Sequence, residues 1–374
     1  MNRMLRNVSL VFVLAVVLLA GCAQPAAPAS PTAEKQAGTT SAKPAEKAES
    51  KPATSKDLSS TVSIGSGTTG GGQYAVATGI AKVVADHTPI KMAVRPFSGP
   101  AAWMPMIETG ELGLGVMSGT DAGWAYNGVN GYDSPNKSLR IVMNGNLLPV
   151  AALVVRNDSD IKSIKDLRGK RVASEYGGNV SMREIVTVAL ESAGLTWNDV
   201  KAVPVPDVAS ALRALQEGRA DAACGGTPTH ATAMEVDAAI GLRLLNFGDL
   251  PPEQANNPPK ELVEILKKRQ PGASIYLQKK QGFLKSDATA FHYPVILVAT
   301  SKLSADTVYE ITKTLYEYDK ELQPVHAWTK DWKQETMFDP LPNVPYHEGA
   351  VRFWKEKGLW TAEAEANQKK LLGQ

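Results

Sequence analysis

Short apolar strands alternate with helical segments from about residue 59 to the C-terminus. The patterns TVSIGSG, IKMAVRPF and LGLGVMSG predict strands, and each is followed by a helical or glycine-rich stretch. The segment from Gln73 to Asp86, for example, has apolar residues at helical spacing. This alternation is typical of α/β proteins, in which helices cover the faces of a largely parallel sheet. We therefore expect an α/β fold.

Two stretches of the chain repeat one local pattern. MIETGELGLGVMSGT (residues 106–120) and ALQEGRADAACGGT (residues 214–227) each contain a helix end, a glycine, a short apolar strand and a turn of small residues. The chain of 374 residues is long enough for two domains of common size. The repeat and the length together predict two similarly built lobes rather than one large sheet.

The N-terminus has the features of an export signal. Arg3 and Arg6 precede an apolar run from Val8 to Ala20, which is shorter than the roughly 20 residues of a spanning helix. The run leads into LAGC, which resembles a bacterial lipobox. We therefore expect residues 1–21 to be a lipoprotein signal peptide and Cys22 to carry lipid. Residues 22–58, rich in Ala, Pro, Ser, Thr, Lys and Glu, would form a disordered tether on the extracytoplasmic side of the cell membrane.

The charge balance bears on possible partners. Lys and Arg number 40 against 38 Asp and Glu, so the net charge is only +2 and a nucleic-acid partner is not expected. If Cys22 carries lipid, Cys224 is the one remaining cysteine, and no intramolecular disulfide can form.

Three glycine-rich turns stand between a strand and a helix. They are GSGTTGGG (residues 65–72), YGGNVS (residues 176–181) and CGGTPT (residues 224–229). Small residues let backbone N–H groups approach a ligand, and a helix N-terminus offers unpaired donors with partial positive charge. Tight turn geometry alone would explain any one such turn, but three of them favour a site for a carboxylate or a phosphate.

The first of these turns also fits the G-x-G-x-x-G pattern of dinucleotide-binding proteins through Gly65, Gly67 and Gly70. The export signal argues against a nicotinamide cofactor, and the second strand ends in Arg95 and Pro96 instead of an acidic residue. A P-loop is excluded because no Lys follows the last glycine. We therefore expect no cofactor.

Signatures of catalysis or metal binding are weak. The five histidines lack metal-ligand spacing, and no G-x-S-x-G motif occurs. Cys224 has no identifiable partner histidine, so a small buried thiol is the simpler interpretation. The sequence favours a protein that is not an enzyme and holds no metal.

The chain resembles the TAXI family of solute-binding proteins, which serve tripartite ATP-independent periplasmic (TRAP) transporters. The resemblance covers the folded region, and it is most specific in IGSGTTGGGQYAVATGIAKVV and VPYHEGAVRFWKEKGLW. It implies a periplasmic-binding-protein fold of type II, with two lobes joined by crossing strands and a solute cleft between them. Lobe 1 would comprise residues 59–146 and 295–374, and lobe 2 residues 147–294. The implied partners are a small organic acid, the TRAP permease and, through the lipid, the membrane.

The family's motif positions, with neighbouring positions in the same turns, give the candidate ligand-binding residues. These are Gly67, Thr68, Thr69, Gly70, Tyr74, Ser98, Gly99, Trp103, Ser118, Gly119, Gly177, Gly178, Asn179, Gly226 and Thr227.

Some positions depart from the family pattern. The resemblance implies a solute such as glutamate or a dicarboxylate like 2-oxoglutarate. Trp103, Met117, Gly119 and Val180 stand where the family more often has polar groups, which predicts a solute less polar than glutamate. A buried ammonium group would need a carboxylate, for which the nearest candidates in sequence are Asp121 and Glu175. We therefore expect a keto, aromatic or branched carboxylate rather than an amino acid. There are two alternatives. The chain could be a solute receptor for an ABC transporter or a sensory kinase, or it could be an exported enzyme on the same fold.

Overall fold

The computed structural model describes residues 57–374, which belong to one compact unit. The predicted signal peptide, Cys22 and residues 23–56 of the predicted tether lie outside the described residues. The described chain joins the fold at its start, because the backbone N–H of Ser59 donates to the hydroxyl of Thr307 at 2.8 Å.

The first sheet has six strands. Across it, β10, β11, β3, β1 and β2 follow one another, and β4 also pairs with β11. The pairs β1–β2 and β1–β3 are parallel, whereas β11 runs antiparallel to β3, β4 and β10. The strands are β1 (Thr61–Ser66), β2 (Lys91–Pro96), β3 (Leu114–Ser118), β4 (Leu139–Val150), β10 (Ser274–Gln278) and β11 (Ala288–Thr300).

The second sheet has five shorter strands in the order β7-β6-β8-β5-β9. Its centre is parallel, and β5 runs antiparallel to β8 and β9. The strands are β5 (Val154–Arg156), β6 (Arg171–Glu175), β7 (Lys201–Val205), β8 (Ala222–Ala223) and β9 (Leu242–Leu244).

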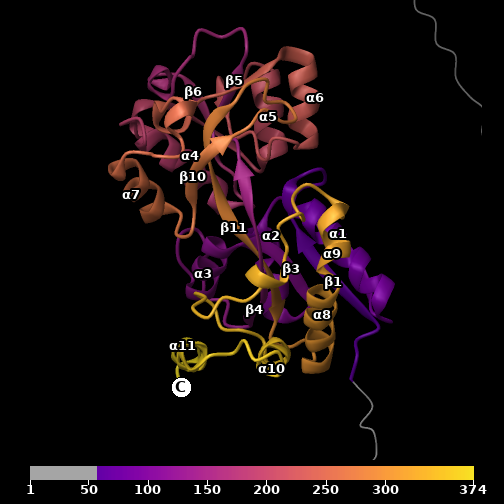
Figure 1. Ribbon diagram of the computed structural model, residues 1–374. Helices are drawn as coiled ribbons and strands as arrows, with labels where there is room; N and C mark the ends of the chain where they lie inside the picture. Colours follow the sequence, from indigo (N-terminus) through magenta and orange to yellow (C-terminus); the bar gives the residue numbers. More distant parts are fainter. Residues whose placement is uncertain (1–56) are drawn as a thin grey trace, which may run out of the picture. The chain divides into compact units, whose positions relative to one another are not determined.

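Eleven α-helices occur in the described residues and cover the two sheets (Figure 1). We call the β1–β3 sheet with its helices the first lobe, and the β5–β9 sheet with its helices the second. The first lobe contains α1 (Gly72–His87), α2 (Pro100–Thr109), α3 (Gly119–Asn127), α8 (Ala305–Glu317), α9 (Asp319–Leu322), α10 (Glu348–Glu356) and α11 (Ala362–Leu372). The second lobe contains α4 (Val180–Glu191), α5 (Val208–Gln216), α6 (Ala231–Ile240) and α7 (Lys260–Arg269).

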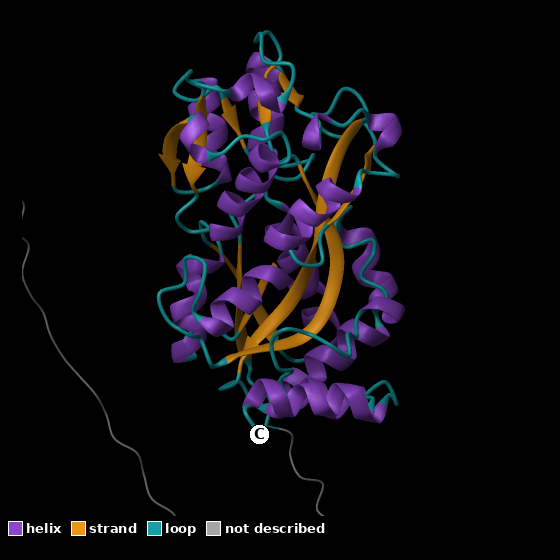
Figure 2. Ribbon diagram, turned by 90° about the vertical axis from the view of Figure 1, so that its left-hand side faces the viewer, coloured by secondary structure: helices purple, strands orange, loops and turns teal. Residues whose placement is uncertain are grey.

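Strands β4 and β11 connect the lobes. They pair from Leu139–Thr300 at one end to Val150–Phe291 at the other, and they run as two long curved strands through the structure (Figure 2). The ladder shifts its register between Pro294 and Ile296. Proline has no N–H to donate, so it weakens a ladder locally. The predicted lobe boundaries, at residues 146/147 and 294/295, fall inside these two strands.

The expected fold class is confirmed: the chain forms two α/β lobes joined by crossing strands. Most predicted elements are present, and the helix from Val208 to Gln216 has the expected bounds. Helix α3 was not predicted, because GTDAGWAYN contains poor helix formers. Its first turn is stabilised by Ser118, whose hydroxyl accepts the Asp121 N–H at 2.9 Å.

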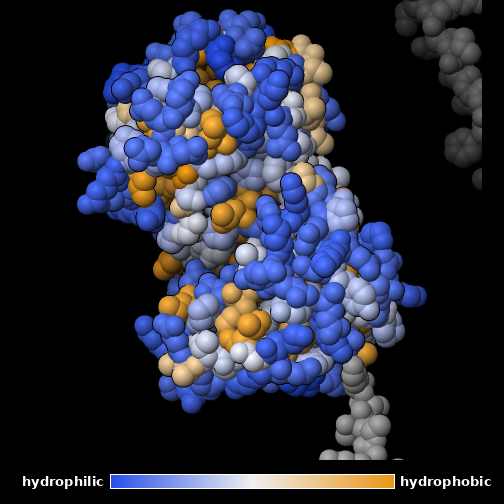
Figure 3. Space-filling model, viewed as in Figure 1, coloured by the Kyte–Doolittle hydropathy of each residue, from blue (hydrophilic) through white to orange (hydrophobic). Residues whose placement is uncertain are grey.

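The surface is mostly hydrophilic on the face shown in Figure 3, and apolar residues lie there in separate small groups. Large exposed apolar side chains among the described residues are scattered along the chain, at Val129, Leu147, Met234, Tyr318 and Leu341. Single exposed apolar residues of this kind are normal on a surface that faces water.

Candidate functional site

A space of about 470 Å³, part of it open to solvent, lies where the two lobes meet the crossing strands. Its lining consists of Gly67, Thr68, Gly71, Gly72, Gln73 and Ser98 from the first lobe; Leu148, Pro149, Val150 and Tyr293 from β4 and β11; and Asn179, Met182, Val208, Gly226, Thr227 and His230 from the second lobe.

Three polar side chains of this lining lack partners in the described structure. Gln73 Nε2, Thr227 Oγ1 and His230 Nδ1 are buried atoms without a hydrogen bond, and the three residues are only 6%, 4% and 3% exposed. A buried polar atom without a partner costs about 1 to 3 kcal/mol. The three residues come from both lobes and line one cavity, so a polar solute there would lie beside them.

Two helices begin at this cavity with open first turns. Helix α1 follows Gly71 and α4 follows Asn179, and neither has a side-chain cap or an acidic residue in its first turn. The Asn179 side chain accepts the Ser181 hydroxyl at 2.8 Å instead. Free N–H groups and the helix dipole attract negative charge. The two N-termini therefore favour an anionic group between the lobes.

No Asp, Glu, Lys or Arg lines the cavity. Burial lowers the pKa of His230 to about 4, so the imidazole is neutral at physiological pH. Burial also raises the pKa of Tyr293 well above its ordinary value, so this phenol stays protonated. The cavity is thus polar but carries no formal charge.

The two carboxylates proposed as ammonium partners lie elsewhere. Asp121 is fully buried, and its Oδ1 accepts the Tyr132 hydroxyl at 2.9 Å. Glu175 has a side chain that is 53% exposed and lies 3.6 Å from the Arg183 guanidinium. Neither lines the cavity, so the cavity holds no carboxylate for an ammonium group.

Six of the predicted site residues line the cavity, and nine do not. Those in the lining are Gly67, Thr68, Ser98, Asn179, Gly226 and Thr227. Those outside it are Thr69, Gly70, Tyr74, Gly99, Trp103, Ser118, Gly119, Gly177 and Gly178.

Three of the glycines outside the lining lie where the lobes touch. The Ala231 N–H donates to the Gly70 carbonyl, and the Ala101 N–H donates to the Gly178 carbonyl, each at 3.1 Å. A Cβ atom on Gly70 would lie 2.5 Å from Ala231 Cβ, and one on Gly99 would lie 2.3 Å from the Gly178 carbonyl oxygen. These glycines let the two backbones meet, which the sequence analysis had attributed to contact with a ligand.

The substitutions that predicted a less polar solute do not lie in the cavity. Trp103 and Met117 are completely buried, and the Trp103 indole packs against the bare backbone of Gly115. Gly119 and Val180 are also absent from the lining. These four residues therefore give no reason to expect a less polar solute, and the class of solute stays a prediction.

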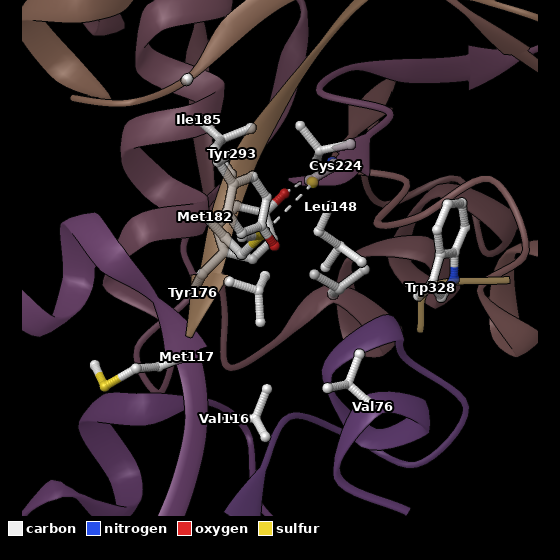
Figure 4. Packing of buried hydrophobic residues seen from close by; sticks show 14 of the residues in the cluster. Val76, Val116, Met117, Leu148, Tyr176, Met182, Ile185, Cys224, Tyr293 and Trp328 are labelled. Atoms are coloured by element: carbon white, nitrogen blue, oxygen red, sulfur yellow. Dashed lines mark hydrogen bonds between the residues drawn. The ribbon is translucent and has the colours of Figure 1, made fainter. Parts of the chain in front are cut away.

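The sequence analysis missed several lining residues. Gln73 directly follows the first glycine turn, and His230 stands three residues after Thr227, so proximity to the turns was a usable signal. Tyr293 and Leu148 come from the crossing strands, where no local signal marks a site. In Figure 4, Tyr293 and Leu148 lie beside Met182, which also lines the cavity.

Cys224 is not among the residues that line the cavity. Its backbone N–H donates to the Tyr176 hydroxyl at 2.9 Å (Figure 4), and its side chain is completely buried. Burial raises the pKa of the thiol to about 12. A thiol that stays protonated is a poor nucleophile, so the structure supports a packing role.

A family model, described as the NMT1-like family, matches residues 64–358. The chain belongs to the NMT1-like family. Among similar solved structures is the alkanesulfonate-binding protein SsuA from Xanthomonas axonopodis pv. citri, bound to MOPS. It is 14% identical with a TM-score of 0.44, and the match covers 82% of this chain and 96% of that one. An ancestral arginine-binding protein bound to arginine is 15% identical with a TM-score of 0.44, and the match covers 72% of this chain and 99% of that one. SsuA from Escherichia coli is 16% identical, with a TM-score of 0.42 and coverage of 83% and 91%.

Residues 57–374 include no helix that is long and apolar enough to cross a membrane. They also include no group of three or more His, Cys, Asp or Glu side chains placed to hold a metal ion.

The buried Asp121 makes stability depend on pH. Burial raises its pKa from 3.8 to about 6, against hydrogen bonds from Ser181, Tyr132 and Ser118 that lower it. Between these values the folded state binds more protons than the unfolded state, so the free energy of unfolding falls as the pH rises. Asp121→Asn removes this titration and keeps the acceptor for Tyr132.

We expect the free energy of unfolding of Asp121→Asn, relative to wild type, to increase by about 2 kcal/mol from pH 4 to pH 6.5 and then to stay nearly level. Urea unfolding of both proteins at each pH measures this difference in the free energy of unfolding. Asp133→Asn, at an exposed position, is the control for a general charge effect. Parallel stability curves for wild type and Asp121→Asn would contradict the prediction.

Proposed function

We propose that this protein is an extracytoplasmic receptor that captures a small organic anion and delivers it to a membrane permease. The observation that carries the proposal is the set of three unpaired polar side chains, Gln73, Thr227 and His230, gathered at one cavity between two lobes. The two open helix N-termini beside them supply donors for a carboxylate or a sulfonate. An exported enzyme on the same fold is the alternative from another class, and it predicts turnover of the bound compound.

The solute is a carboxylate without an ammonium group. An amino acid would bring its ammonium into a cavity whose lining offers no Asp or Glu, and a buried charge without a partner is costly. The apolar wall of Leu148, Val150 and Met182 suits an aliphatic or aromatic remainder. The lining therefore favours a keto, aromatic or branched acid, the class that the substituted family positions had also predicted.

Capture works by closure of the lobes about β4 and β11. The backbone contacts at Gly70 and Gly178 support this, since they are interactions that only a closed arrangement can make. The register shift beside Pro294 supplies a weak point of the ladder at which the strands can bend. Closure removes the solute from water and strengthens its charge-assisted hydrogen bonds.

The permease is of the TRAP type or of the ABC type. The resemblance to TAXI proteins favours the first, whereas the similar solved structures include an alkanesulfonate-binding protein and the substrate-binding protein of an amino acid ABC transporter, which favours the second. A sensory kinase is a third possible partner for a receptor of this kind. A permease gene next to this one in the genome would decide between them.

Lipid on Cys22 would hold the receptor at the extracytoplasmic face of the membrane. Cys22→Ser should abolish labelling with palmitate and block normal processing, because the thiol that receives the lipid is gone. Metabolic labelling followed by immunoprecipitation measures both effects. Cys224→Ser, which alters the buried cysteine, is the control and should stay labelled. Labelled Cys22→Ser protein would contradict anchoring at this residue.

Calorimetry against a panel of acids tests the solute class. We expect micromolar binding, about 8 kcal/mol, for an acid such as 4-methyl-2-oxopentanoate or phenylacetate, and at least about tenfold weaker binding for leucine and glutamate. Leucine is the matched comparison, because it has the same carbon skeleton as 4-methyl-2-oxopentanoate. Micromolar glutamate binding without a response to the less polar acids would show that the cavity was misinterpreted.

Gly99→Ala tests closure. The added Cβ would lie 2.3 Å from the Gly178 carbonyl oxygen in the other lobe, so the lobes could not meet as they do. We expect at least about tenfold weaker binding and a larger radius of gyration with solute present. Gly177→Ala is the matched control, because nothing lies within 4 Å of its Cβ position. Equal affinity and equal scattering of the two variants would contradict closure at this contact.

A further inference from the structure

We propose that His230 is the ionic partner of the bound anion and that it takes up one proton from water when the solute enters the cavity. This inference rests on the proposed function and adds to it the residue that meets the anion and a proton-coupled step. The balance is simple: a neutral imidazole, a proton and an anion give an imidazolium paired with the anion. No other bond forms or breaks.

The position of His230 suits this role. It follows the third glycine turn and immediately precedes α6, and its backbone is fixed by a hydrogen bond from its N–H to the Thr227 carbonyl at 2.9 Å. The side chain is 3% exposed and lines the cavity, and its Nδ1 has no partner among the described residues. The ring therefore lies at the cavity wall, and one of its nitrogens has no protein partner.

Two glycines hold the imidazole between the lobes. A Cβ atom on Gly226, in the second lobe, would lie 2.9 Å from Cδ2 of the ring, and one on Gly71, in the first lobe, would lie 3.6 Å from Nε2. Gly71 also precedes the open N-terminus of α1. The ring is thus placed beside the helix end that attracts an anion, and both are brought to the solute when the lobes meet.

The charged and titratable groups around His230 are few. Asp207, at the start of α5, favours the protonated ring, whereas burial disfavours it and lowers the pKa to about 4. Tyr293 of β11 faces the cavity as a neutral phenol. The residues of α1 and of the glycine turns in the lining carry no charge. A solute anion would be the first full negative charge inside the cavity, and it would favour the imidazolium.

The sign of the pH dependence follows from this change. When the bound state holds one more proton than the free state, affinity rises as the pH falls, by up to about tenfold per unit. The rise ends near pH 4, where the ring of the free protein becomes protonated. Carboxylic acids stay ionised above about pH 5, so measurements between pH 5.5 and pH 8 report the protein and not the solute.

The experiment is calorimetry with 4-methyl-2-oxopentanoate and with phenylacetate at several pH values, in buffers of different ionisation enthalpy. We expect wild type to take up a measurable fraction of a proton, approaching one per solute toward the acidic end, and to bind more tightly as the pH falls. His230→Gln keeps a polar amide but cannot titrate, so it should bind with no proton uptake and with a flat pH profile. His347→Gln, which changes another buried histidine with a pKa of about 4 outside this cavity, is the control and should behave as wild type.

Binding by wild type without proton uptake, or equal proton uptake by wild type and His230→Gln, would overturn this inference and leave the receptor function in place. Absence of binding by every acid of the panel would overturn the proposed function, and this inference with it.

Discussion

The pairing of β4 with β11 is the interaction on which the rest of the structure depends. Each strand is long enough to serve both lobes, and β11 lies between β3 and β4 in one lobe and between β10 and β4 toward the other. Leu148, Pro149 and Tyr293 of the same two strands form the floor of the cavity. The element that joins the lobes thus also lines the candidate site, so bending of these strands would move the lobes and change the cavity together.

The absence of charged residues from the cavity lining is a second constraint, and it acts on which solute can bind. The cavity lining has amides, hydroxyls, backbone N–H groups and an imidazole, but no residue with a full charge at neutral pH. Before the solute enters, such a site attracts an anion by oriented dipoles, and it disfavours an ammonium group that would remain unpaired. Because the three unpaired side chains come from both lobes, the site is complete only where the lobes meet. Selectivity and closure therefore depend on the same contacts.

Glycine allows close approach at two kinds of place in this interface. Gly72 and Gly226 lie in the cavity lining, where a Cβ atom would lie 2.8 Å from the Thr227 methyl group and 2.9 Å from the His230 ring, so they let these two side chains reach the cavity. Gly70, Gly99 and Gly178 lie at contacts between the lobes, where a Cβ atom would collide with the opposite backbone or side chain. The sequence presents both kinds as one class of turn, since a glycine that makes room for a side chain and one that makes room for another backbone have the same local pattern.

The sequence by itself determined the α/β class, the alternation of strands and helices, and the three turns that meet at the site, because these depend on local periodicity and on the conformational freedom of glycine. It also pointed to Thr68, Ser98, Asn179 and Thr227, which stand in or beside those turns. Only the tertiary structure decided that Trp103 packs in the core, that Asp121 is buried away from the cavity, and that Tyr293 and Leu148 belong to it. These placements depend on which strands cross and which turns face one another, and contacts between segments far apart in the chain leave no local pattern in the sequence.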